Sequence, residues 1–256
     1  TNRKNNMSIP VSVFIITLNE EKNIQRVLES VQDFNEIIVV DSGSTDNTIS
    51  IAKKLGAKVS HQDWLGFSKQ KQYAMSLCQN DWVLNLDADE EIPVALKKEI
   101  NSAIESDRAN AIRFKRNDLF LNKSYPEICK LPSNVRLYKK SQASFDKDCL
   151  VHESADVIGP EITLNTPFIH YGYNEIHTLL QKQNEYSTLK AKEKFLRGKK
   201  FSYIKLALVY PVEFIKKFIF QRYISFGWRG LILSLMNANY AFLKEAKLYG
   251  LYQNKE

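Results

Sequence analysis

Four acidic residues follow an apolar run directly in the stretch WVLNLDADEE, Trp82 to Glu91. Carboxylates this close repel one another and cannot be buried without a partner, so a cation is expected beside them. Asp87 and Asp89 alternate along an extended chain, and hard oxygen ligands of this kind suit Mg²⁺ or Mn²⁺. The alternative is a solvated acidic loop that starts a helix. It is the stronger explanation for Glu90 and Glu91, because the helix dipole stabilises negative side chains near the N-terminus of a helix.

Polar residues also end two earlier β-branched runs. The run VSVFIITLN ends in Thr17 and Asn19, and the run EIIVVDSGS contains Asp41. In open, mainly parallel sheets, ligands bind at the carboxyl ends of the strands. Thr17, Asn19, Asp41 and Asp87 are all expected at that edge, so the sequence predicts one site there.

Helices are expected between these strands. In EEKNIQRVLESVQDF one helical face is apolar, and its members are Ile24, Val27, Leu28 and Val31. A second helix is expected to start near Asp46 and to close on Gly56, and a third around SKQKQYAMSLC. With the strands AKVSH and DWVLNLD, the alternation predicts an α/β fold with a doubly wound, mainly parallel sheet.

The later part of the chain is organised differently. Between Ile92 and Ile169 the segments are shorter, which indicates a mixed extension of the sheet, and helices dominate from Tyr171 onward. We therefore expect an α/β domain over residues 8–181 and a helical C-terminal region over residues 182–256. A composition of 44% hydrophobic and 25% charged residues is sufficient for one sizeable core with an appendage.

Basic residues concentrate in the C-terminal region. The whole chain has a net charge of +7, whereas residues 182–256 hold 15 Lys and Arg against five Glu and no Asp, which is +10. The remaining residues therefore sum to −3. A basic region on a mildly acidic body indicates an anionic partner, either a membrane surface or a nucleic acid.

The stretch PVEFIKKFIFQRY favours the membrane surface. Its two faces differ, one with Val212, Ile215, Phe218, Ile219 and Tyr223, the other with Glu213, Lys216, Lys217 and Gln221. Amphipathic, basic and aromatic segments suit an anionic membrane interface. The alternative is a helix that packs on the α/β domain or on a dimer partner. No recognised nucleic-acid motif is present, so we expect no nucleic-acid partner.

The cysteines indicate a reducing compartment. Cys78, Cys129 and Cys149 show no paired spacing, so the sequence suggests neither a disulfide framework nor a zinc site. The polar start TNRKNNMSIP is not typical of a signal peptide, and the apolar stretch LALVYPVEFI is too short to span a bilayer. We expect a cytoplasmic protein, peripheral on the inner face of the cytoplasmic membrane.

Three motifs together resemble those of family 2 glycosyltransferases with the GT-A fold. They are VFIITLNEEKNI, IIVVDSGSTDNT and LNLDADEEI, in this order and spacing. The stretches GFSKQKQYA, LVHE and IHYGY are similar to the subgroup that adds sugars to lipopolysaccharide cores. The resemblance covers roughly residues 9–184. It implies an inverting, metal-dependent transferase that moves a hexose, expected to be glucose, from a UDP-sugar to a glycolipid, the lipopolysaccharide or lipooligosaccharide inner core.

The resemblance also implies roles in donor binding. Thr17, Asn19 and Glu20 would line the base pocket, and Asp41 would hydrogen-bond the base or the ribose. DSGSTDNT by itself could be only a capped turn into a helix. Asp87 would bind the ribose.

Charges on the donor would be met by a metal and by basic residues. Asp89 would hold Mn²⁺ or Mg²⁺, which neutralises charge on the departing diphosphate. Lys71 lies where many relatives place a basic residue near the diphosphate, although Lys69 could serve instead and either could be solvated. His170 would bind the metal or touch the diphosphate, and a core histidine is equally compatible with the pattern.

An inverting transfer also needs a base that takes the proton of the acceptor hydroxyl. This chain lacks the Glu-Asp pair that many family 2 members use, and VHE stands in its place. We predict Glu153 as the base, with His152 shaping the site, and Asp146 and Asp148 as rivals. A surface ion pair is the simpler explanation of Glu153.

Other functions remain compatible with these residues. The acceptor could be another polysaccharide or an undecaprenyl-linked sugar, and a nucleotide-sugar-binding protein without turnover would carry the same donor site. A nucleic-acid binder would explain the basic region, and it predicts binding to DNA that depends steeply on salt.

Overall fold

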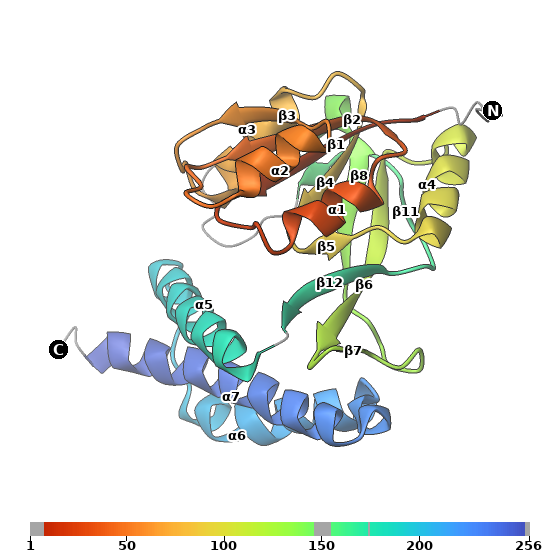
Figure 1. The fold of residues 1–256 in the computed structure, drawn as a ribbon. Coiled ribbons are helices and arrows are strands. Elements are labelled where there is room, and N and C mark those ends of the chain that lie inside the picture. The colour runs from red at the N-terminus through yellow and green to blue at the C-terminus, as the bar shows by residue number, and fades with distance from the viewer. Residues whose placement is uncertain (1–7, 146–154, 174, 254–256) are drawn as a thin grey trace. The chain divides into compact units, whose positions relative to one another are not determined.

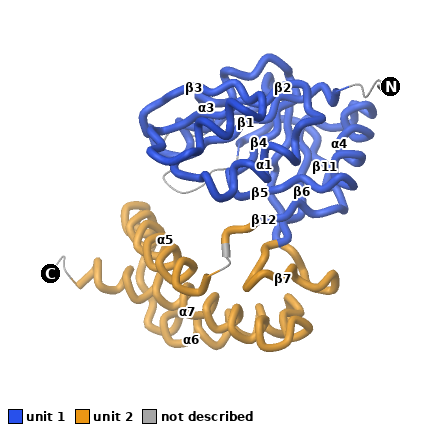
Figure 2. Tube along the Cα trace, in the orientation of Figure 1, with its two compact units in different colours: residues 1–117, 132–170 blue, residues 118–131, 171–256 orange. Residues whose placement is uncertain are grey.

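The computed structural model describes residues 8–145, 155–173 and 175–253 (Figure 1). Contacts divide the chain into two compact units, which Figure 2 colours separately. The first unit comprises residues 1–117 and 132–170, and the second comprises residues 118–131 and 171–256. This division does not coincide with the predicted boundary after residue 181.

Four parallel strands form the first part of the sheet, in the spatial order β3-β2-β1-β4. Their bounds are β1 Ile9–Thr17, β2 Phe34–Asp41, β3 Lys58–His61 and β4 Trp82–Asp87. β-branched and other large apolar residues dominate β1, β2 and β4, which are buried on both faces as expected for strands covered by helices. The predicted doubly wound, mainly parallel sheet is confirmed.

Helices cover both faces of these strands (Figure 1). They are α1 Ile24–Ser30, α2 Thr48–Lys54, α3 Phe67–Ser76 and α4 Val94–Ser106. Side chains of α1, α2 and α4 join one hydrophobic cluster with Val13 and Ile15 of β1, whereas α3 joins a second cluster with Phe14. The alternation along β1 therefore separates two cores. The predicted apolar face of α1 is buried, although the helix is shorter than its sequence pattern.

The sheet continues beyond β4 as a mixed extension, as predicted. β8 (Ser133–Lys139) pairs antiparallel with both β4 and β6, and the path then runs through β12 to β5. The other strands of the extension are β5 Glu90–Glu91, β6 Ala111–Phe120, β7 Lys123–Ser124, β11 Glu161–Thr163 and β12 Phe168–Tyr173. A separate small sheet has the strands β9 Ala143–Ser144 and β10 Asp156–Val157, beside the 3₁₀ turn η1 Lys140–Gln142.

The second unit is mainly helical. Its elements are α5 Ile176–Leu196, α6 Tyr203–Ile215, the π-helical turn η2 Lys216–Phe220, the 3₁₀ turn η3 Tyr223–Phe226 and α7 Trp228–Gln253. α7 packs against α5, α6 and η3. At Gly230 a Cβ atom would lie 1.8 Å from the carbonyl oxygen of Tyr223, so only glycine permits this close approach of α7 to η3.

The apolar face that the sequence predicted for residues 212–223 is only partly exposed to solvent. Val212, Ile215 and Ile219 are exposed, but Tyr223 is buried in the core of the helical unit and Phe218 is half-buried. The helix changes to a π turn and then breaks at Arg222, which has a positive φ of 63°, so ideal helical spacing fails after Ile215. None of the helices that the structure describes is long and apolar enough to cross a membrane.

Candidate functional site

Thr17, Asp41 and Asp87 come together at the carboxyl edge of the parallel strands. Thr17 is in register with Asp41 on β2, and Ile16 is in register with Asp87 on β4. Three strands that are distant in sequence therefore end side by side in these polar residues. The predicted juxtaposition at this edge is confirmed, because parallel pairing places equivalent strand ends at one side of the sheet.

The loop after β1 is fixed by hydrogen bonds to the loop after β2. Asn19 has a positive φ of 56°, its backbone N–H donates to Ser44 Oγ at 2.8 Å, and its Oδ1 accepts from Thr45 N at 2.9 Å. The backbone N–H of Glu20 donates to Thr48 Oγ1 at 2.8 Å. Asn19 and Glu20 therefore lie in an ordered double loop at the strand ends.

The Asp41 carboxylate is buried and organises its own turn. Its Oδ2 accepts from the backbone N–H groups of Gly43 and Ser44, both at 2.8 Å, and its Oδ1 accepts from Ser44 Oγ. These contacts are those of a capped turn. Thr17 differs, since its Oγ1 is buried and has no hydrogen-bond partner among the described residues. A buried hydroxyl left unsatisfied at a strand end is available to a ligand.

Asp87 lies between two buried cations. Lys71 Nζ from α3 donates to its Oδ1 at 3.0 Å, and Arg136 Nη2 from β8 donates to its Oδ2 at 3.0 Å. Burial alone would raise the pKa of Asp87, but Lys71 and Arg136 hold that pKa far below its usual range. Of the two candidate lysines, Lys71 reaches the site, whereas Lys69 is exposed. Asp87 is therefore ionised at neutral pH and held in one orientation.

Glu90 belongs to this charged cluster, which corrects the expectation of a solvated loop at a helix start. It is fully buried in β5, accepts from the backbone N–H of Asp87 at 3.0 Å, and pairs with Arg136. Burial raises the pKa of Glu90; Arg136 acts in the opposite direction, and the Asp87 carboxylate adds to the rise. Helix α4 begins only at Val94, so Glu90 lies outside its first turn.

Asp89 and His170 form a second pair beside this cluster. His170 Nε2 on β12 lies 3.4 Å from Asp89 Oδ2, although 80 residues of chain separate them. β12 runs antiparallel to β5 with His170 opposite Glu90, and this pairing brings the imidazole to the acidic turn. Both side chains are only partly exposed.

The donor set of this pair fits a divalent cation. A carboxylate oxygen and an imidazole nitrogen are both metal ligands, and cations such as Mg²⁺ are commonly bound by one or two protein groups plus substrate phosphates. Within the described part of the chain, no group of three His, Cys, Asp or Glu could hold a metal ion. Among the described residues, Asp89 and His170 could therefore supply two ligands to a cation.

Arg136 was not anticipated from the sequence. It is an almost fully buried arginine that also lies with its guanidinium carbon 5.5 Å from the ring centroid of Phe168. The signal was present in VRLYKK, where a charged residue stands between Val135 and Leu137 in a strand pattern. A buried arginine requires acidic partners, and the acidic turn after β4 supplies them.

The predicted base and its neighbours are outside the described residues. This applies to Glu153 and His152, and equally to the rivals Asp146 and Asp148. Their roles stay predictions.

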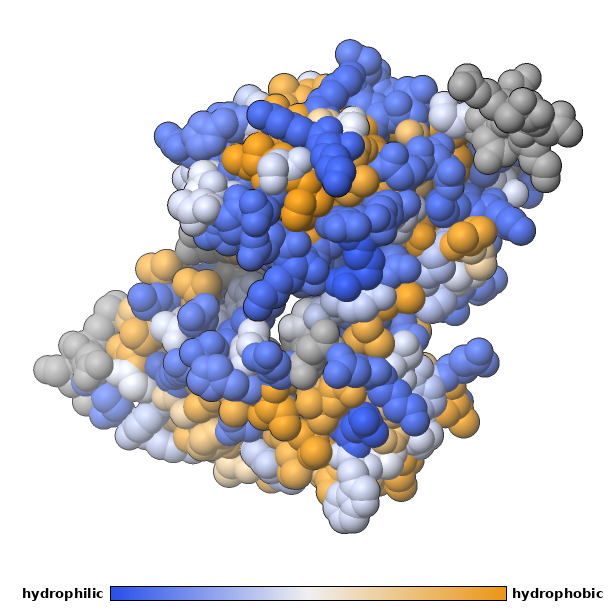
Figure 3. Space-filling model, viewed as in Figure 1, coloured by the Kyte–Doolittle hydropathy of each residue, from blue (hydrophilic) through white to orange (hydrophobic). Residues whose placement is uncertain are grey.

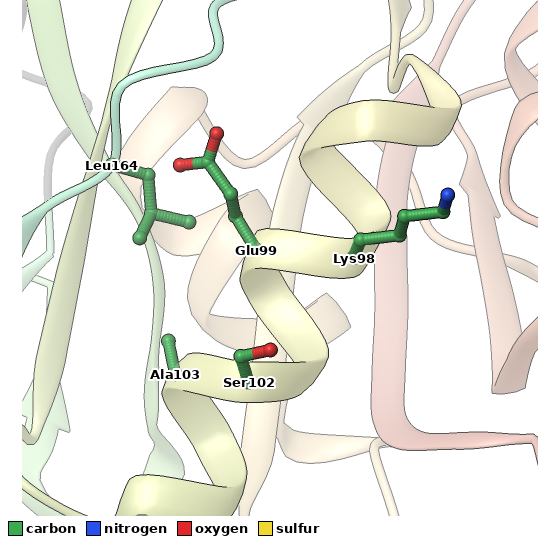
Figure 4. A pocket seen from close by; sticks show the side chains of 5 residues that line it. All are labelled: Lys98, Glu99, Ser102, Ala103 and Leu164. Carbon is green, nitrogen blue, oxygen red and sulfur yellow. The ribbon is translucent and has the colours of Figure 1, made fainter.

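A shallow pocket on α4 has a different character (Figure 4). Its lining residues are Lys98, Glu99, Ser102, Ala103 and Leu164. Glu99 points toward Leu164, whereas Lys98 points away. The Glu99 carboxylate accepts from Asn165 N at 2.9 Å and from Thr166, so it fixes the segment after β11. The one acidic group of this pocket is therefore already engaged, and the strand-end cluster remains the candidate site.

Comparison with known proteins gives a consistent result. Residues 12–149 match the family described as "Glycosyl transferase family 2". "Uncharacterized glycosyltransferase RT0209" of Rickettsia typhi is 41% identical over 93% of this chain and 86% of the relative. "Lipopolysaccharide core biosynthesis glycosyltransferase LpsC" of Rhizobium meliloti is 31% identical over 94% and 92%. The crystal structure of S. aureus TarS 1–349 in complex with UDP aligns with 16% identity and a TM-score of 0.49, over 96% and 92%.

Proposed function

Because this chain belongs to glycosyltransferase family 2 and has a GT-A fold, we propose that it moves a hexose from a UDP-sugar to a glycolipid with inversion at the anomeric carbon. The observation that carries this proposal is the convergence of Thr17, Asp41 and Asp87 at one strand edge, with Asp89 and His170 beside them. Glucose is the expected sugar.

The donor nucleotide would lie over the strand ends. The buried Thr17 Oγ1 is available for a hydrogen bond to it, and Asn19 and Glu20 would bound the base through the ordered loop. Asp41 would act mainly by fixing the turn that presents Ser44, since its oxygens already accept from that turn. Asp87, locked by Lys71 and Arg136, would accept from ribose hydroxyls without reorganising.

Asp89 and His170 would hold a divalent cation, Mn²⁺ or Mg²⁺. The chemistry supplied there is Lewis-acid neutralisation of the diphosphate as it departs. Lys71 would supply positive charge near the diphosphate, and the contacts of Lys71 and Arg136 with Asp87 would keep that carboxylate in place.

Glu153 would take the proton from the attacking hydroxyl of the acceptor, and His152 would shape the space around it. The support is the motif VHE and the absence of a Glu-Asp pair after the acidic turn. Proton removal at the moment of attack makes the hydroxyl oxygen a stronger nucleophile toward the anomeric carbon.

The acceptor is proposed to be a lipid-linked oligosaccharide of the lipopolysaccharide inner-core type. The 31% identity to LpsC over most of both chains supports this substrate class. The net charge of +10 over residues 182–256 supports binding of the enzyme to an anionic membrane surface, which we propose is the inner face of the cytoplasmic membrane.

A UDP-release assay across a panel of UDP-sugars with Mn²⁺ tests the transfer reaction. The full chain is expected to release UDP from one hexose donor faster than from the others, and faster still with a lipid-linked acceptor. UDP binding without any release, at every donor tried, would favour the alternative of a nucleotide-sugar-binding protein without turnover.

A further inference from the structure

The exposed side of α6 is apolar. A typical surface helix instead buries its apolar face against a core and exposes its polar face. Four large side chains on it are 73%, 53%, 58% and 44% exposed, and they are Ile204, Leu208, Val212 and Ile215. Their spacing of four, four and three residues places them on one helical face. Within α6, all of whose residues are described, none is buried. We call these four residues the α6 face.

Apolar exposure continues past the end of α6. Ile219 and Phe220 of η2, Ile224 of η3 and Trp228 at the start of α7 are all exposed, Trp228 to 81%. In Figure 3 hydrophobic residues gather on the surface of this helical unit. Apolar exposure repeated along α6, η2, η3 and the start of α7 indicates an interaction surface, whereas single exposed apolar side chains are common in ordinary proteins.

The chain around the α6 face is strongly basic. Residues 197–229 contain eight Lys and Arg and one acidic residue, Glu213, so this segment alone sums to +7. Glu213 is itself paired with Lys216 at 3.2 Å. The partner must therefore offer both an apolar medium and negative charge.

This charge decides between the possible partners. A second copy of the chain docked face to face would bring two basic segments together, each with Glu213 as its one acid, and that acid is already paired with Lys216. An anionic bilayer interface supplies acyl chains for the apolar side chains and phosphates for the basic ones. Trp and Tyr side chains, present here as Trp228 and Tyr203, are common at that depth.

We propose that the α6 face, extended by the exposed residues of η2, η3 and Trp228, inserts into the interface of an anionic phospholipid bilayer. The helix lies in the plane of the membrane, consistent with its length and with the lack of any described helix that could span. This inference deepens the proposed function, on which it rests for the lipid-linked acceptor, and it names apolar insertion rather than charge alone as the source of attachment.

Sedimentation with vesicles of phosphatidylcholine and phosphatidylglycerol tests the inference. The triple variant Ile204→Gln, Leu208→Gln and Ile215→Gln should bind about tenfold or more weakly than the parent, at low and at high salt alike. The matched control changes three comparably exposed apolar residues elsewhere to Gln: Val94, Ile158 and Leu196. The control should bind like the parent.

A second variant separates insertion from attraction. Lys216→Gln, Lys217→Gln and Arg222→Gln together should weaken binding mainly at low salt, because screening already suppresses their contribution at high salt. Tryptophan fluorescence, to which Trp228 contributes beside Trp64 and Trp82, should shift to the blue on vesicle binding in the parent and in the control, and much less in the α6-face variant. All variants should keep the melting temperature and the UDP affinity of the parent.

Two results with vesicles would overturn the inference, and so would one by light scattering. One is a parent chain that ignores anionic vesicles, and the other is an α6-face variant that sediments as the parent does. If light scattering instead shows a parent dimer that this variant dissociates, the face is a contact between copies. UDP release without vesicles is measured separately. Vesicle binding without UDP release would contradict the transferase proposal and leave the membrane inference intact. UDP release without vesicle binding would contradict the membrane inference alone.

Discussion

Arg136 is the residue through which the two acids of the site are held together. Its guanidinium is almost fully buried and donates to Asp87 and Glu90, while Lys71 holds the other oxygen of Asp87. The buried Glu90 and the partly exposed Asp87 lie against two buried cations, Lys71 and Arg136. Removal of one member leaves an uncompensated charge in the protein interior.

We therefore predict that Arg136→Met lowers the free energy of unfolding by roughly 3 kcal/mol, because Glu90 loses its cation. Urea unfolding at pH 7 measures this loss. The matched control is Arg113→Met, whose partner Glu161 is a surface acid, and we expect a loss of about 1 kcal/mol or less. Equal losses in the two variants would show that the buried cluster adds nothing beyond a surface pair.

Glu153→Gln should keep UDP affinity and lower the transfer rate by about 10²- to 10⁴-fold, the usual contribution of a general base. The substitution keeps the shape of the side chain and removes its basic lone pair. Single-turnover rates with donor and acceptor measure the effect. Turnover near the parent rate would move the role to Asp146, Asp148 or another group.

Residue types at strand ends could be predicted, but their partners could not. Thr17, Asp41 and Asp87 follow from where apolar runs stop, because parallel strands share one carboxyl edge. The contact between Arg136 and Glu90 was not predicted, because it depends on the pairing of β8 with β4 and on the short strand β5. Such long-range pairings leave no local period in the sequence.

At the scale of elements, a buried carboxylate on β2 joins four segments. Glu36 accepts from Ser12 Oγ of β1, from Lys58 Nζ of β3 at 2.7 Å and from the backbone N–H of Gln79 at 2.8 Å. Burial alone would raise the pKa of Glu36, but the hydrogen bonds from Lys58, Ser12 and Gln79 hold it below its usual range. The parallel strands are thus tied together at the edge opposite the site.

Glu36→Gln should lower the free energy of unfolding by about 1–3 kcal/mol at pH 7, since an amide N–H₂ would face a donor. A carboxyl whose pKa is lowered on folding adds stability above its unfolded pKa, near 4.5. That stability is lost as pH falls through the lower folded value. The difference from the parent should therefore narrow in urea titrations at acidic pH. A difference that is constant between pH 7 and pH 3 would contradict this account, and the exposed Glu29→Gln serves as control.

Helix and strand order could be predicted well, whereas helix ends could not. The apolar spacing of Ile24, Val27, Leu28 and Val31 identified α1, but the helix covers only Ile24–Ser30 of a longer pattern. Flanking residues such as Asn19 and Glu20 are instead used by hydrogen bonds between loops. Tertiary contacts of this kind override local helical propensity.

At the scale of the whole molecule, the charge pattern predicted a distinct C-terminal part, and the contacts divide the chain into units with other limits. Residues 118–131 belong to the helical unit because Phe120, Tyr125 and Cys129 join its core. Composition changes along the chain cannot show that a hairpin far upstream completes this core. The predicted division into residues 8–181 and 182–256 stays a prediction.

Calorimetric titration with UDP tests most directly that the strand-end cluster is a metal-dependent nucleotide-sugar site. The account predicts that UDP binds in the presence of Mn²⁺, and that a chelator or Asp89→Ala abolishes this binding. Asp33→Ala should bind like the parent, because that acid pairs with Lys97 at the other end of β2. UDP affinity unchanged by the chelator and by Asp89→Ala would contradict the central claim.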